Sequence, residues 1–301
     1  MRDDVKAIQK LVDDLSVAVA RIKPAKIRPM VVIKFLNCQD PRYKMHALYC
    51  ASDKRAYRAV RLLHDLKANL DARTTDDQGC VVAHVAAQMG DRAMVRLLHE
   101  LKADLQCRVL HDGGLPIHSS AQQGHSDTTA LLLELKADPN VQDNEGRTPL
   151  WVASFDGYIG VIKTLIAAGA KVNLADAQGM TPLYAASSQG QVRSISTLAE
   201  LSASIDQETN KGWSPIAMAA AAHAGKDEVV RLLAHLGARL HASDGHGFWM
   251  WYKDDDKRHQ ATEFWTEIVQ AGGDEGTDDS LRYARGFVCL RTQKCGTPDE
   301  R

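Results

Sequence analysis

A period of about 33 residues is the feature that most constrains this chain. A glycine precedes a short apolar block at positions 79, 113, 146, 179 and 212, which lie 34, 33, 33 and 33 residues apart. Thr-Pro-Leu recurs at 148–150 and 181–183, and Glu-Leu-Lys-Ala-Asp at 100–104 and 134–138. Periods of this size are typical of repeat proteins, in which each unit buries its apolar face only against its neighbours.

Each period predicts two short helices joined by a tight turn. Thr148 can cap a helix by accepting a backbone N–H, and Pro149 suits the first helical position, where that N–H has no partner in any case. Gly157 ends this helix, because glycine tolerates the left-handed conformation common at helix ends. A second helix then carries an apolar stripe that includes Val161 and Leu165.

These residues closely resemble the ankyrin repeat, whose signature is Thr-Pro-Leu-His-x-Ala in a 33-residue unit. The resemblance implies an all-α repeat solenoid of stacked helix-turn-helix units with β-turn or hairpin fingers. Its signature histidine survives at His84 and His118, where hydrogen bonding within the repeat is expected. The match is strongest in 143–172 and 176–205, good in 76–105, 110–139 and 209–240, and worn in 40–70 and 244–274.

This register predicts four segments. Residues 1–39 form an N-terminal helical cap, and residues 40–240 form about six ankyrin repeats, the first of them degenerate. Residues 241–274 form a degenerate C-terminal capping repeat with an insertion, and 275–301 a polar tail.

The glycine that usually follows the second helix is missing from several repeats. It is present as Gly169 and Gly237, but is replaced elsewhere by Lys67, Lys102, Lys136 and Ser202. If these four residues occupy left-handed positions, each strains the backbone by roughly 1 kcal/mol.

The N-terminal segment has two features that suggest contacts of its own. Apolar residues spaced three and four apart form a heptad seam, which fits a helix capping the first repeat or a short coiled coil that weakly pairs two chains. Residues 1–65 also hold fourteen Lys/Arg against seven Asp, although the whole chain has a formal net charge of -1. This excess is either a solvated face or a contact for nucleic acid or an acidic membrane. The seam comprises Val5, Ile8, Val12, Leu15 and Val19.

The sequence does not indicate an enzyme. It lacks phosphate-binding loops, dinucleotide fingerprints and the common metalloprotease or serine-hydrolase motifs. The histidines and six cysteines show no metal-ligand spacing, so we expect no metal, cofactor or small-molecule substrate. The charged start lacks a signal peptide's apolar stretch and no apolar run could span a bilayer, which favours a cytoplasmic or nuclear location.

The resemblance therefore implies a non-enzymatic scaffold or adaptor that binds another protein through the concave groove of its stacked repeats. Family members grip partners with turn tips and the inner face of the first helix. The tip position after the glycine becomes large in later repeats, and we expect Trp213 to be substantially exposed there; the alternative is that it packs onto the next unit. The candidate partner-binding residues are Arg147, Phe155, Asp156, Met180, Gln189, Lys211 and Trp213.

A further alternative concerns Asn140. Ankyrin loops modified by asparagine hydroxylases have the form Leu-x5-Asp-x-Asn, which Leu132, Asp138 and Asn140 fit. Asn140 is then either an enzyme's substrate or a residue that only shapes its turn.

Overall fold

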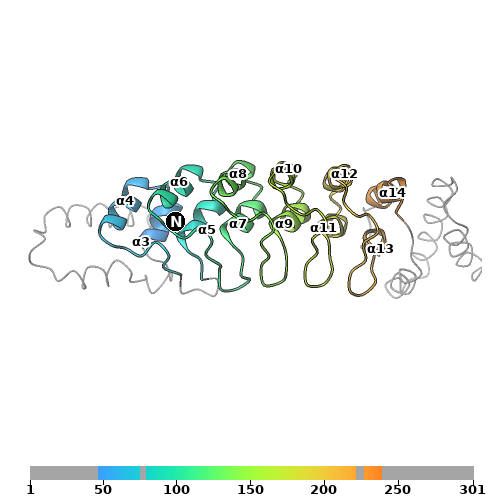
Figure 1. The fold of residues 1–301 in the computed structure, drawn as a ribbon, viewed down its shortest axis with the longest axis horizontal. Coiled ribbons are helices and arrows are strands. Elements are labelled where there is room, and N and C mark those ends of the chain that lie inside the picture. The colour runs from blue at the N-terminus through green and yellow to red at the C-terminus, as the bar shows by residue number, and fades with distance from the viewer. Residues whose placement is uncertain (1–46, 75–78, 222–226, 239–301) are drawn as a thin grey trace, which may run out of the picture. The chain divides into compact units, whose positions relative to one another are not determined.

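The computed structural model describes residues 47–74, 79–221 and 227–238, which fall into two compact units divided between Ala137 and Asp138 (Figure 1). The predicted N-terminal cap at 1–39, its seam from Val5 to Val19, the C-terminal capping repeat at 241–274 and the tail at 275–301 lie outside the described residues.

The first unit contains three helix pairs within its described residues. The pair in the degenerate first repeat is α3 (Ala47–Asp53) and α4 (Tyr57–Asp65). The next pairs are α5 (Val82–Gln88) with α6 (Arg92–Glu100), and α7 (Pro116–Gln122) with α8 (Ser126–Glu134). The first repeat thus has both helices even though little of the repeat signature remains in its sequence.

The described part of the second unit also contains three pairs. They are α9 (Pro149–Asp156) with α10 (Ile159–Ala167), α11 (Pro182–Gln189) with α12 (Val192–Glu200), and α13 (Pro215–Ala221) with α14 (Asp227–His235). The structure is therefore an all-α repeat solenoid, as the sequence predicted.

Within each unit the helices form two rows (Figure 1). The first helix of a pair packs on the first helix of the next, as α11 does on both α9 and α13, and α12 packs on α10 and α14 in the second row. Fully buried aliphatic side chains fill the space between the rows, including Leu150, Leu165, Leu183 and Leu198. Each pair therefore buries its apolar face against its neighbours.

The first helices begin as the sequence predicts where the threonine is present. The hydroxyl of Thr148 accepts the N–H of Trp151 at 3.1 Å, with Pro149 in the first helical position. Leu115 has no hydroxyl to offer, and its own backbone N–H instead donates to Nδ1 of His118 at 3.2 Å. The signature histidine is therefore part of the start of α7.

The second helices end in the same hydrogen-bonded motif whether or not glycine is present. Lys136 has φ of 73°, its N–H donates to the carbonyl of Leu133, and the N–H of Ala137 donates to that of Leu132. Gly169 and Ala170 make the equivalent bonds with φ of 91° at the glycine. The prediction of left-handed conformations is confirmed at all four substituted positions, which are Lys67, Lys102, Lys136 and Ser202.

Restoring glycine at one of these positions should stabilise the protein. We predict that Lys136→Gly raises the free energy of unfolding by about 1 kcal/mol, because it removes the strain of a left-handed side-chain-bearing residue. The matched control is Gly169→Ala, which adds a Cβ with nothing within 4 Å of it at the same left-handed position. This control should lower stability by a similar amount in urea unfolding. A loss of stability in Lys136→Gly would contradict the strain argument.

Candidate partner-binding surface

Three candidate residues hold the same place in consecutive turns of the second unit. In the first turn Asp143 donates its N–H to the carbonyl of Arg147, and its Oδ1 accepts the N–H of Arg147 at 2.8 Å. Asp176 makes the same two bonds with Met180. Thr209 makes them with Trp213, with its hydroxyl in place of the carboxylate. Arg147, Met180 and Trp213 thus form one series, which we call the turn-tip ladder.

Backbone hydrogen bonds join successive turns of the ladder. The N–H of Ala177 donates to the carbonyl of Glu145 at 2.9 Å, and the N–H of Asn210 donates to that of Gln178 at 2.9 Å. A Cβ placed on Gly146 would lie 2.7 Å from the backbone nitrogen of Ala177. Gly146 and Gly179 therefore allow the next turn to approach closely, which holds the three turns in register.

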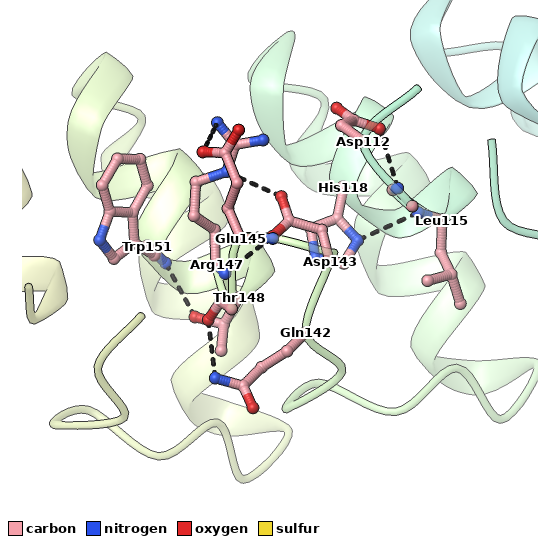
Figure 2. Close-up of polar contacts among 12 residues, drawn as sticks. Asp112, Leu115, His118, Gln142, Asp143, Glu145, Arg147, Thr148 and Trp151 are labelled. Carbon is pink, nitrogen blue, oxygen red and sulfur yellow. Dashed lines mark hydrogen bonds and ion pairs between the residues drawn. The ribbon is translucent and has the colours of Figure 1, made fainter. Parts of the chain in front are cut away.

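Arg147 is held at its tip by two carboxylates, and Trp151 lies on its other side (Figure 2). Its Nε donates to Oδ2 of Asp143 at 2.7 Å, and Nη1 lies 3.2 Å from a carboxylate oxygen of Glu145. The guanidinium carbon lies 5.9 Å from the centre of the Trp151 ring, which in turn stacks on Phe155 at 5.3 Å. The cation at the tip and the two rings on α9 therefore lie one after another.

The remaining candidates differ in exposure. Phe155 and Met180 are partly buried, whereas Gln189 at the end of α11 and Lys211 at the third tip are exposed. Asp156 ends α9, and burial raises the pKa of its carboxyl. Trp213 is partly buried, which is less than the substantial exposure that the sequence predicted and less than the burial against the next unit that was its alternative.

Two residues of this region were not singled out from the sequence. Trp151 is buried and donates its indole N–H to the carbonyl of Met180 at 3.1 Å, linking α9 to the next tip. Asp176 is only 7% exposed, and its Oδ2 has no hydrogen-bond partner. The sequence shows that Arg147 gives way to Met180 one repeat later, but not that the carboxylate of Asp176 is buried there.

The signature histidines lie in the first unit and play structural roles. Nε2 of His84 lies 3.1 Å from the carbonyl of Gly114 in the next repeat, so its bond joins two repeats and is not confined to one as predicted. Burial is the main reason that the pKa of His84 falls to about 4, although the Gly114 carbonyl opposes this shift.

Asn140 is held at both ends of its amide. Its Nδ2 donates to the carbonyl of Gly169 at 3.2 Å, and its Oδ1 accepts the N–H of Lys171 at 2.7 Å. The side chain therefore connects its turn to the end of α10, in addition to any role as an enzyme's substrate.

Neither a metal centre nor a membrane span is found among the residues described here. No group of three His, Cys, Asp or Glu residues in these ranges could hold a metal ion, and none of the helices there has the length and hydrophobicity to cross a bilayer.

The paired helices, the left-handed turns and the linked tips define a helical repeat protein of the kind that binds other macromolecules. The family model described as ankyrin repeats (3 copies) matches residues 83–176 and 158–244, and a second, described as ankyrin repeats (many copies), matches 48–99. The chain belongs to the ankyrin-repeat family.

An ankyrin repeat-containing protein of Schizosaccharomyces pombe is 44% identical to this chain over 41 residues. The matched stretch is 14% of this chain, which spans about a fifth (20%) of the relative's length. The similarity therefore concerns the repeat and not the whole protein.

The close approach at the tips gives a test of the ladder. We predict that Gly146→Ala lowers the free energy of unfolding by about 2 kcal/mol or more, because the new Cβ meets backbone atoms of the next turn that cannot move aside. Gly169→Ala, with a similar φ but open space, should cost about half as much in urea unfolding. Equal losses would show that contact between the tips contributes nothing.

Burial of His84 predicts a pH-dependent stability. Since its pKa is about 4 in the folded chain against an ordinary value of 6.5, its neutral form is favoured in the fold. The contribution of neutral His84 to the free energy of unfolding is therefore fully present above pH 6.5. It is lost progressively, by up to about 3 kcal/mol, as the pH drops toward 4. In urea unfolding across this range, His84→Gln should show a shallower loss than the wild type. Parallel curves would refute the assignment.

Proposed function

We propose that this protein is a non-enzymatic scaffold or adaptor that binds a partner protein through the turn-tip ladder and the adjoining face of α9. Ankyrin repeats are in general protein-interaction modules, and no catalytic family is indicated for this chain. The proposal assigns that general role to one surface of the second unit.

The main support for this proposal is that the turn-tip ladder consists of large side chains. Arg147, Met180 and Trp213 occupy one turn position in three consecutive repeats, and none of the three is fully buried. Backbone bonds of the same kind close all three turns whatever the side chain is, so the turns do not require these large residues. Arginine and large aromatic residues are those that most often contribute binding energy at protein interfaces.

The surface is also pre-organised. Arg147 is held by Asp143 and Glu145, and Phe155 is held against Trp151, before any partner arrives. Because fewer side chains lose freedom on binding, such a surface binds at a lower entropic cost than a loose one. Gln189 and Lys211, both exposed, would form the polar rim of the same contact.

The test is capture of partners from a native lysate by the full chain, followed by affinity measurement with the captured protein. We predict that Trp213→Ala weakens binding by about 2 kcal/mol without changing the far-ultraviolet circular dichroism. The matched control is Tyr158→Ala, which removes an exposed aromatic ring at the other end of α9 from the tips. Equal binding by both variants and the wild type would remove the ladder from consideration.

The same experiment separates the alternatives drawn from the sequence. A steep fall in affinity with salt, unaffected by Trp213→Ala, would favour a contact of the basic N-terminal 65 residues with nucleic acid or an acidic membrane. Intact-mass analysis of the native protein detects hydroxylation, which would add one oxygen atom, and fragmentation shows whether that atom is on Asn140.

A further inference from the structure

Two neighbouring turns of the second unit are built alike around an aspartate. Oδ1 of Asp143 accepts the N–H groups of Glu145 and Arg147 at 3.0 and 2.8 Å. Oδ1 of Asp176 accepts the corresponding N–H groups of Gln178 and Met180 at 2.9 and 2.8 Å. In both turns one carboxylate oxygen alone makes the bonds that close the turn.

The two turns differ at the second carboxylate oxygen. Oδ2 of Asp143 accepts a charged hydrogen bond from Nε of Arg147 at 2.7 Å. The residue at the same place one repeat later is Met180, which has no hydrogen to donate from its side chain. Oδ2 of Asp176 is accordingly buried with no hydrogen-bond partner. An ionised carboxylate oxygen in that position is unfavourable unless a donor reaches it.

Negative charge is in excess around Asp176. Arg147 and Glu145 are both close enough to act on its carboxyl electrostatically, with opposite effects. Asp143, Glu145 and Asp176 together place three carboxylates beside the single guanidinium of Arg147, which already pairs with two of them. Burial raises the pKa of Asp176, although its two backbone hydrogen bonds and the charge of Arg147 oppose this shift.

We propose that Asp176 receives an arginine side chain of the partner protein, held as the chain itself holds Arg147 one repeat earlier. The arginine would donate to Oδ2 beside Met180, whose unbranched side chain can change rotamer to admit it. Arginine fits better than lysine, because the example within this chain is a guanidinium bonded to the same oxygen of an aspartate. This inference rests on the proposed function and adds the chemistry of the partner to it.

The probe for this experiment is a random dodecapeptide phage library selected on the immobilised full chain. The selected peptides are then synthesised and measured against the wild type, Asp176→Asn and Trp213→Ala. We expect them to share one arginine. The Asp176→Asn variant should bind these peptides about 30-fold more weakly than the wild type does, which is the effect of losing one partner of a buried charge pair. Replacing that arginine by citrulline, which has the same shape and no charge, should cause the same loss, with little further loss in Asp176→Asn.

Asn at position 176 keeps an oxygen for the two backbone N–H groups, so the variant should melt no lower than the wild type. A marked drop in melting temperature would mean that Oδ2 serves the fold, and would overturn the proposal. Unchanged affinity in Asp176→Asn, or peptides that share a lysine or no basic residue, would also overturn it. If either of these outcomes occurs but the peptides bind the Trp213→Ala variant more weakly than the wild type, the proposed function survives and only the arginine site fails. If Trp213→Ala binds them unchanged, the proposed function fails as well.

Discussion

Burial of apolar side chains between neighbouring helix pairs is the interaction on which the rest of this structure depends. No helix described here exceeds nine residues, a length that is not stable alone in water. Leu150, Leu183 and Ile216 are nearly or fully buried at equivalent places of successive first helices, so each pair is stabilised by the pairs beside it. The turns at the tips then need only close on themselves and stay in register with the next turn.

Much of this architecture could be predicted from the sequence because its signals are local. Thr148, Pro149 and Gly157 define the start and end of α9 by their own backbone chemistry, and the repeat register alone indicates a left-handed position at Lys136. The bond from His84 to Gly114 could not be predicted, since it depends on how one repeat stacks on the next. The partial burial of Trp213 escaped prediction for the same reason.

At the candidate site the side chains differ from one repeat to the next, whereas the backbone conformation of the turn stays the same. Arg147, Met180 and Trp213 share one set of turn hydrogen bonds, so this position is free to change without disturbing the fold. Replacing an arginine by a methionine leaves the aspartate of the second turn without the partner that the first turn has. The repeat itself thus provides the comparison that exposes Asp176. The sequence alone showed the substitution but not the burial that gives it meaning.

A partner that covers the tips of the second unit should protect their backbone N–H groups from exchange. Hydrogen–deuterium exchange of the full chain, free and with the captured partner bound, tests this most directly. We expect binding to slow exchange in the turn segments 143–148, 176–181 and 209–214, while α10 and α12 on the second row exchange as in the free chain. Slowed exchange confined to α10 and α12, or to residues 1–46, would contradict it.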